Sequence, residues 1–265
     1  MRWSAGAPWT RGARHDEGDS LFRGIDACLG LDGLPQSGTG QATMLTGVNC
    51  AQLAGRHYGP YPHSATRATI RDQSIFARLG ATETAFANAY PPRFFDWVER
   101  MRRWPVTTRA CLDAGVRIRT IEDLEAGMGV AADITGRGLS RELRLPVTEV
   151  TPSEAAARLL KLSSQASFTL FEVFHTDKAG HAQSREAAAR ILDPLGGLLD
   201  ALYEMRPEDV TMLLTSDHGN LEDLRVKTHT RNEVPLSVVG PGAGAFAGVT
   251  DLTGIVPAIE SVLSG

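Results

Sequence analysis

The chain has 265 residues, of which 42% are hydrophobic, so it is long enough to bury one large core or two modest ones. Its 27 basic and 31 acidic side chains give a formal charge of −4, which argues against a nucleic-acid or anionic-membrane partner. Three widely spaced cysteines without a CxxC pair exclude a disulfide framework and a zinc ribbon, and favour a reducing cytoplasm. No apolar run approaches the ~20 residues that span a bilayer, and residues 1–20 contain no secretory signal.

Residues 1–20 have no helical or strand period and are rich in Gly, Arg, Ser and Asp, which predicts a disordered or mis-started lead-in. Residues 21–265 then form one domain. A Gly-rich turn at residues 34–40 feeds a helix-length stretch that Gly47 can close, which puts Ser37 at a helix N-terminus. The pattern next predicts a helix over 72–79, a strand over 84–88 and a helix over 93–103. Short helices and polar loops follow, and a small cap-like region is possible at about residues 90–150.

From residue 151 the pattern is sharper. Thr151-Pro152-Ser153-Glu154 is typical of a helix start and predicts a helix to about residue 163. Apolar runs at 168–174, 210–214 and 235–239 predict buried strands. Helices are expected over 184–203, interrupted near Pro194, and over 253–263. Strands that alternate with helices predict an α/β sheet covered by helices.

Three short motifs in this half contain metal-ligand side chains. Asp177 and His181 are four residues apart, Asp217 and His218 are adjacent, and His229 follows between two threonines. Two carboxylates and three imidazoles are enough to hold two divalent cations, and paired cations are a common means of phosphoryl transfer. Because the first two motifs follow predicted strands, we expect them to meet at one edge of the sheet. Each motif alone is also compatible with an ordinary polar loop, so the prediction depends on their combination.

The combination resembles the alkaline phosphatase superfamily, closest to its cofactor-independent phosphoglycerate mutase and phosphopentomutase branch. The string TSDHGN followed by His-Thr is similar to that branch's C-terminal metal signature, and TDKAGH is similar to its Asp-x-x-Gly-His element. The segment from Ser37 to Gly47 is similar to the superfamily's nucleophile segment. The resemblance covers about residues 31–265. It implies an alkaline-phosphatase-like three-layer sandwich with a mostly parallel central sheet and helices on both faces.

The resemblance also implies roles for these residues. One ion, manganese or zinc, would be held by Asp177, His181 and His229. The other would be held by Asp217 and His218, with Ser37 as the metal-bound nucleophile, because direct coordination activates a serine hydroxyl without a neighbouring base. Thr39 is the alternative nucleophile in the same turn, and helix N-capping is an alternative role for Ser37.

Four further residues are weaker candidates. Lys178 could neutralise a phosphate oxygen, and Asn220 could donate to the substrate, so both are candidate substrate-binding residues. Arg56 and His57 could line the entrance to the site, although an Arg-His pair on a loop is usually only exposed.

One family feature has no clear counterpart. The family's first strand delivers an Asp-Gly whose aspartate binds the second metal, whereas Asp32-Gly33 lies only five residues before Ser37 and Asp26 lacks a following glycine. This predicts either an N-terminally truncated chain, with the first strand possibly missing, or a depleted second site.

Three functions remain open at this stage. The first is a cytoplasmic metal-dependent phosphatase or phosphodiesterase that acts on a small phosphorylated substrate through a phosphoserine. The second is a phosphomutase-like isomerase, although the inserted domain of that branch has no room here. The third is an impaired homologue that binds one metal.

Overall fold

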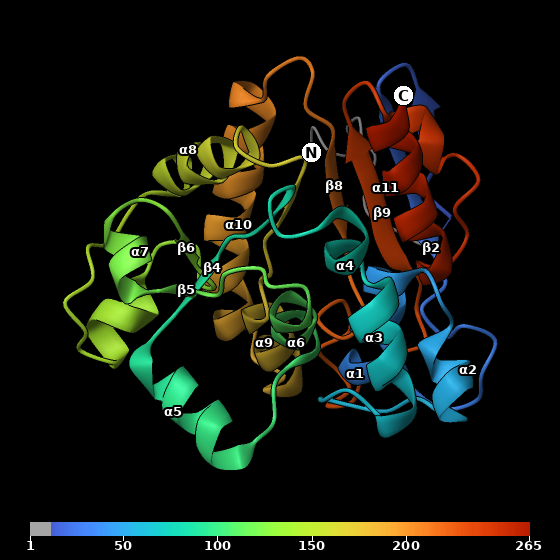
Figure 1. The fold of residues 1–265 in the computed structure, drawn as a ribbon, viewed down its shortest axis with the longest axis horizontal. Coiled ribbons are helices and arrows are strands. Elements are labelled where there is room, and N and C mark those ends of the chain that lie inside the picture. Colours follow the sequence, from blue (N-terminus) through green and yellow to red (C-terminus); the bar gives the residue numbers. More distant parts are fainter. Residues whose placement is uncertain (1–11) are drawn as a thin grey trace.

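The computed structural model describes residues 12–265, so the expectation for residues 1–11 lies outside the described part. Its elements combine helices with short strands (Figure 1). The strands are β1 (His15–Glu17), β2 (Ser20–Ile25), β3 (Thr84–Phe86), β4 (Asn88–Tyr90), β5 (Arg119–Thr120), β6 (Val130–Ala131), β7 (Phe168–Leu170), β8 (Met212–Thr215) and β9 (Val234–Val239). The α-helices are α1 (Ser37–Thr46), α2 (Cys50–Ala54), α3 (Arg67–Gln73), α4 (Ile75–Leu79), α5 (Pro92–Met101), α6 (Val106–Asp113), α7 (Ile121–Glu125), α8 (Pro152–Ser163), α9 (His175–His181), α10 (Arg185–Met205) and α11 (Ile255–Ser264).

The largest sheet has the strand order β1-β2-β9-β8, and all of its neighbouring strands are antiparallel. Parallel pairing occurs in two smaller sheets, β3 with β7 and β5-β4-β6. The predicted α/β class is therefore confirmed, but the expectation of a mostly parallel central sheet is wrong for the four-stranded sheet. Apolar runs predict buried strands, which the structure shows for β9, whereas β7 and most of β8 are only partly buried. The direction of a strand depends on the connections, which the runs do not contain.

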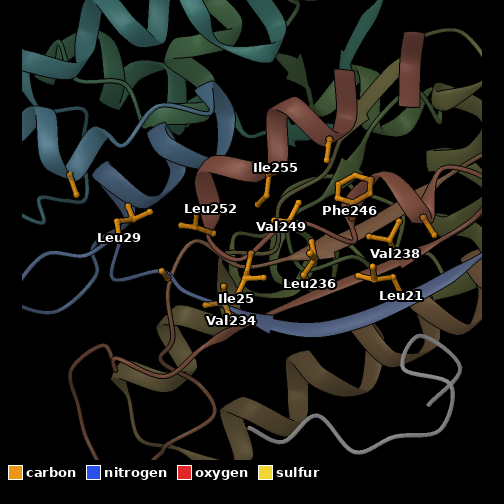
Figure 2. Close-up of a cluster of buried hydrophobic side chains, with 14 residues drawn as sticks. Leu21, Ile25, Leu29, Val234, Leu236, Val238, Phe246, Val249, Leu252 and Ile255 are labelled. Carbon is orange, nitrogen blue, oxygen red and sulfur yellow. The ribbon is translucent and has the colours of Figure 1, made fainter. Parts of the chain in front are cut away.

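Helices cover both faces of the four-stranded sheet, as expected for three layers. On one face, alternate β9 residues Val234, Leu236 and Val238 pack with Phe246 and with Ile255 of α11 (Figure 2). On the other face, Met212 and Val239 pack against α10. Figure 1 shows α11 and α10 on opposite sides of β8 and β9.

Several predicted elements differ from the observed ones. β1 and β2 fall at residues where the pattern predicted no element, because the six residues of β2, SLFRGI, do not alternate regularly between apolar and polar. The predicted helix over 72–79 is divided between α3 and α4 at Ser74, whose extended backbone and side chain cap α4. The helix α10 continues through Pro194, so the predicted interruption there is wrong. The predicted helix start at residues 151–154 is confirmed, and Thr151 and Glu154 form a capping box at the start of α8.

Among the described residues, no helix is both long and apolar enough to cross a bilayer.

The position of Leu236 allows a test of the core between β9 and α11. Leu236 is fully buried, so Leu236→Ala should lower the free energy of unfolding by about 2–5 kcal/mol through lost burial and a residual cavity. The control is Leu263→Ala, because Leu263 at the end of α11 is 39% exposed and its loss should cost about 0.5 kcal/mol or less. Urea denaturation measures both, and equal losses in the two variants would contradict the assigned core.

Candidate metal and phosphoryl-transfer site

The short helix α9 brings Asp177 and His181 onto one face. It begins soon after β7 ends, and four residues in a helix make slightly more than one turn, so the two side chains lie one above the other. The Asp177 Oδ1 atom is 3.3 Å from His181 Nε2. The four-residue spacing in the sequence is therefore realised as helix geometry.

The loop between β8 and β9 delivers His229 to the same place. The loop folds back on itself where the Thr230 amide donates to the Gly219 carbonyl, at 3.0 Å. His229 Nε2 lies 3.3 Å from Asp177 Oδ1 and 3.1 Å from His181 Nε2. The ligand atoms of Asp177, His181 and His229 lie within 4.8 Å of one another, a spacing that one ion could bridge.

The hydrogen bonds on the far side of both imidazoles identify their tautomers. His229 Nδ1 is 2.6 Å from the Pro35 carbonyl, and His181 Nδ1 is 2.7 Å from the Lys227 carbonyl. A carbonyl oxygen only accepts, so each Nδ1 carries the hydrogen and each neutral ring directs a lone pair from Nε2 toward the other. Such a contact is repulsive unless a proton or a cation lies there. Carbonyl-anchored Nδ1 atoms are also the usual support of metal-binding histidines, so these residues fit a divalent ion.

The ionisation of Asp177 and His229 is coupled. Burial raises the pKa of Asp177, but the close contact with His229 and the charges of His218 and His181 outweigh burial and lower it. Burial lowers the pKa of His229, but the contacts with Asp177 and the Pro35 carbonyl outweigh it and raise it. A proton therefore binds well where the donor atoms converge, as a metal cation would.

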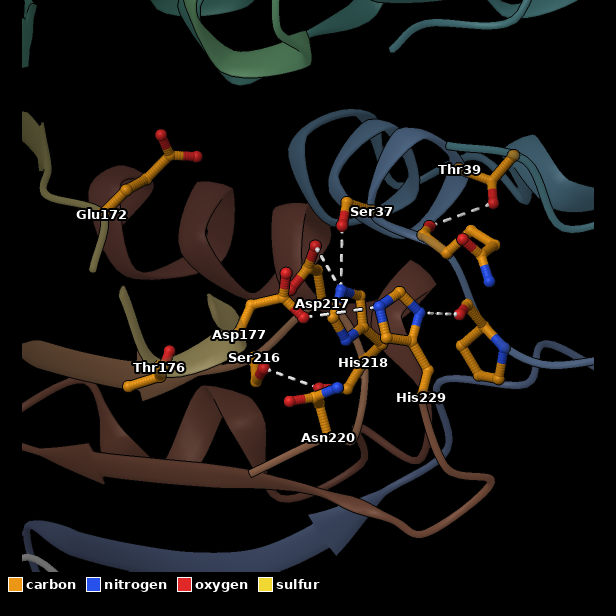
Figure 3. A network of polar contacts seen from close by, with 12 residues as sticks. Ser37, Thr39, Glu172, Thr176, Asp177, Ser216, Asp217, His218, Asn220 and His229 are labelled. Atoms are coloured by element: carbon orange, nitrogen blue, oxygen red, sulfur yellow. Dashed lines mark hydrogen bonds and ion pairs between the residues drawn. The ribbon is translucent and has the colours of Figure 1, made fainter. Parts of the chain in front are cut away.

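Ser37 is the first residue of α1, and its hydroxyl faces this cluster (Figure 3). Ser37 Oγ is 2.8 Å from His218 Nε2, which is also 3.6 Å from Asp217 Oδ2. Both Asp217 and His218 follow the end of β8, and the His218 ring stacks on His229 with centroids 3.7 Å apart. The structure thus brings Ser37 and the five predicted donor residues into one continuous group.

Asp217 and His218 are held by fewer hydrogen bonds than Asp177, His181 and His229. Asp217 Oδ2 and His218 Nδ1 are buried and have no hydrogen-bond partner, whereas Nδ1 of both His181 and His229 is anchored. Burial is the largest cause of the raised pKa of Asp217. A buried carboxylate oxygen without a partner fits a cation, but the unanchored His218 ring is held only by stacking and by its Nε2 contacts.

Gly40 lets α1 approach the Asp217 backbone closely. A Cβ at this position would lie 2.4 Å from the Asp217 carbonyl oxygen, so any larger residue would push α1 from the loop. Thr39, the alternative nucleophile, is fully buried and its hydroxyl donates to the Gln36 carbonyl at 3.2 Å. Ser37, and not Thr39, therefore contacts the donor group.

The two predicted substrate-binding residues lie on different sides of α9. Lys178 is exposed, and its ammonium lies 4.9 Å from the centre of the Phe174 ring. Asn220 is buried, and both polar atoms of its amide lack a hydrogen-bond partner. The Asn220 side chain presses against Gly180, where a Cβ would lie 1.3 Å from Asn220 Oδ1.

Neither candidate for the family's first aspartate reaches this group. The strand β2 does end next to Asp26, but the carboxylate of Asp26 accepts the amides of Cys28 and Leu29, each at 2.8 Å, and so closes a turn. Asp32 is exposed. Neither Asp26 nor Asp32 therefore takes the position of the aspartate that, in the family pattern, binds the second metal.

Glu172 belongs to none of the sequence motifs, yet it lies near Asp217 in the structure. It follows β7, where the Asn88 side chain bonds its amide and its carbonyl, each at 2.8 Å, and the Thr107 hydroxyl donates to its carboxyl group. Burial is the largest cause that raises the pKa of Glu172 to about 7, the charge of Asp217 adds to it, and Thr107 opposes it. In the sequence, Glu172 stands out only as the single acid within the apolar run FTLFEVF. An acid on the exposed face of a strand would give the same pattern.

The fold and the donor group define an α/β metalloprotein, and comparisons with known proteins agree. The profile described as Metalloenzyme superfamily matches residues 147–259, which contain every predicted ligand except Ser37. The phosphopentomutase of Chromohalobacter salexigens is 30% identical over 122 residues, which is 46% of this chain and 27% of the relative. The 2,3-bisphosphoglycerate-independent phosphoglycerate mutase of Mycoplasmoides gallisepticum is 26% identical over 43% of this chain and 24% of the relative.

The structural comparison extends over more of the chain. The alkaline phosphatase from the Antarctic bacterium TAB5 superposes with a TM-score of 0.53 at 12% identity, covering 92% of this chain and 88% of that one. This likeness supports the fold. The family profile and the curated relatives agree with the resemblance to the alkaline phosphatase superfamily that the sequence motifs indicated. The segments that this chain matches cover between 24% and 44% of the length of the curated relatives.

Replacement of Asp177 tests the ion site. Asp177→Asn removes the anionic charge between the two imidazoles, and we expect affinity for Mn²⁺ or Zn²⁺ to fall at least about a hundredfold, since even supporting residues contribute 10- to 100-fold. The control is Asp193→Asn on the exposed side of α10. Calorimetric titration with each metal measures the affinities. Unchanged binding in Asp177→Asn would show that the ion binds elsewhere.

The raised pKa of Glu172 predicts a pH dependence of stability for the metal-free protein. Because its pKa is about 7 when folded and near the ordinary 4.5 when unfolded, the folded state favours the protonated form. This contribution is present below pH 4.5 and is lost as the pH rises through 7. Glu172→Gln should therefore gain stability over the wild type between pH 5 and pH 8.

Urea denaturation of the two proteins at both pH values measures this difference. Glu99→Gln, on the exposed surface of α5, is the control and should follow the wild type. A constant difference between Glu172→Gln and the wild type would mean that Glu172 is ionised throughout this range.

Proposed function

We propose that this protein is a metal-dependent phosphoryl-transfer enzyme, of phosphatase or phosphodiesterase type, with Ser37 as its nucleophile and a small phosphorylated compound as its substrate. The observation that carries the proposal is the position of Ser37 Oγ, 2.8 Å from His218 Nε2 at the edge of the donor group. Curated relatives named as phosphomutases, and the superfamily itself, support phosphoryl transfer in broad terms.

The donor residues divide into two proposed sets. Asp177, His181 and His229 would hold one divalent ion, and Asp217 and His218 would hold the other together with Ser37. Mixed carboxylate and imidazole ligands without cysteine accept manganese or zinc. When bound, the ions would supply positive charge that lowers the pKa of the Ser37 hydroxyl and balances the charge of the reacting phosphate.

The protein's own groups hold and orient the phosphate. Ser37 opens a ten-residue helix, and among the described hydrogen bonds the amides of Ser37 and Gly38 have no acceptor. Amides at a helix N-terminus favour a bound phosphate. The Ser37 oxygen would then form a bond to phosphorus while the ester alcohol leaves, which gives a phosphoserine. Asn220 could donate to substrate with its unpaired amide, and Lys178 could do so after leaving the Phe174 ring.

Hydrolysis of the phosphoserine is favoured over its return to the substrate as in a mutase. The segment between α1 and β7 is largely used for the core, since Phe76, Phe86 and Val106 are fully buried in a cluster with Leu45 of α1. Little of this segment remains for a separate domain that repositions a substrate. The buried thiols of Cys28, Cys50 and Cys111 support action in a reducing compartment such as the cytoplasm.

A second candidate is a homologue that binds one ion and lacks catalysis. The turn-closing role of Asp26 and the unanchored Nδ1 of His218 favour it, because both weaken the second set of donors. In this case the first set would still bind metal.

Hydrolysis of an aryl phosphate in the presence of Mn²⁺ or Zn²⁺ distinguishes the two candidates. Ser37→Ala should lower kcat/KM by at least about a thousandfold, the scale on which loss of a nucleophile acts. Ser64→Ala, an exposed serine in the same part of the chain, should retain wild-type activity. A phosphoserine at Ser37 should also be found by mass spectrometry after an acid quench. Equal rates for Ser37→Ala and the wild type would exclude Ser37 as the nucleophile, and a metal-binding wild type without turnover would favour the second candidate.

A further inference from the structure

One carboxylate joins the two ends of the loop between β8 and β9. Glu222 Oε2 accepts the Asn220 backbone amide at 2.6 Å. Glu222 Oε1 accepts the Asn232 side-chain amide at 3.0 Å and also the Thr230 hydroxyl. A carboxylate only accepts hydrogen bonds, and hydrogen bonds to a charged acceptor are the stronger kind. Glu222 therefore holds residue 220 against residues 230 and 232.

Each of the two joined segments carries one histidine of the donor group. Asn220 lies two residues after His218, and Thr230 directly follows His229. The two imidazole rings stack with centroids 3.7 Å apart and an angle of 17° between their planes (Figure 3). Rings can stack this closely only while the two backbone segments keep their relative position, which the three hydrogen bonds to the carboxylate fix.

The two histidines differ in the other contacts that hold them. His229 Nδ1 is bonded to the Pro35 carbonyl at 2.6 Å, so this ring has a support of its own. His218 Nδ1 is buried without a hydrogen-bond partner. The His218 ring therefore depends on its stack with His229 for the position in which its Nε2 atom meets Ser37 Oγ at 2.8 Å.

We propose that Glu222 is a positioning residue that keeps the His218 ring stacked on His229, and so prepares the second donor set beside Ser37. This inference rests on the proposed function, because the division into two donor sets is made there. Glu222 belongs to neither set and takes part in no chemical step. Loss of its carboxylate should weaken the second set, Asp217 and His218, and leave the first set in place.

The test compares Glu222→Ala with Asp223→Asn. Asp223 is the matched control, because its carboxylate lies in the same loop and pairs with Arg225 at 2.7 Å. Glu222→Gln is the variant of equal size, in which an amide offers one accepting oxygen in place of two. When Glu222→Gln is combined with Asn232→Asp, the amide and the carboxylate change places, so the contact between positions 222 and 232 is restored. Circular dichroism checks that each variant is folded.

Proton NMR of the metal-free protein gives the first measurement. Protons of a ring that stacks on another aromatic ring resonate upfield, and His218→Gln identifies the signals of the His218 imidazole. In Glu222→Ala these signals should move toward the position of an exposed histidine. In Asp223→Asn and in the exchange variant they should remain at the wild-type position. A general role in stability would not move them while the protein stays folded.

Calorimetric titration with Mn²⁺ or Zn²⁺ gives the second measurement. The ion whose binding Asp177→Asn weakens belongs to the first set, so the other ion reports on the second. Because supporting residues contribute about 10- to 100-fold to metal affinity, Glu222→Ala should weaken the second ion on this scale and leave the first unchanged. Glu222→Gln should show a smaller loss of the same kind, and the exchange variant should recover the second ion.

Two results would overturn the role of Glu222. One is a folded Glu222→Ala protein whose His218 signals keep the wild-type position. The other is an equal loss of both ions, which would mean that the carboxylate only stabilises the loop as a whole. A wild type that binds a single ion would contradict the two-ion part of the proposed function, and the NMR signals would still decide whether Glu222 positions His218.

Discussion

Two imidazole nitrogens that both present lone pairs cannot remain 3.1 Å apart unless positive charge lies between them, and this constraint organises the site around His181 and His229. Their Nδ1 atoms are fixed by carbonyls from two different loops, so neither ring can turn to relieve the contact. Asp177 supplies the negative charge that makes a cation favourable at this point. The helix α9, the loop before β9 and the turn before α1 each contribute to this arrangement, so their relative positions are coupled to the charge state of the site.

The sequence predicted the members of this group well, because local spacing carried the information. A four-residue interval becomes one helical turn in α9, and adjacent Asp217 and His218 become loop residues after a strand. Their convergence was expected from a rule for neighbouring parallel strands, although β7 and β8 lie in different sheets of the structure. The capping box of α8 was predictable for the same reason, since all of its contacts are within four residues.

Features that depend on distant contacts were not predictable in this way. The direction of β9 against β2 and β8 is decided by chain connections, and β2 has no regular alternation of apolar and polar residues that would mark it as a strand. Glu172 became notable only when folding buried it near Asp217 and beside Thr107. Likewise, the lack of a hydrogen-bond partner for His218 Nδ1 depends on which residues the fold places around the ring. In each case the relevant quantity is a long-range environment, which residue type and spacing do not specify.

The contact between Gly180 and Asn220 has a consequence for any attempt to vary this site. These residues are distant in sequence, yet the absence of a side chain at one leaves the space that the other fills. Nearly every substitution of Gly180 alone would clash with the Asn220 side chain. Replacement of Asn220 alone by a smaller residue would leave a void under α9. The two positions therefore have to be varied together. When segments are exchanged between homologous proteins, α9 and the loop that carries Asn220 have to be transferred as a pair.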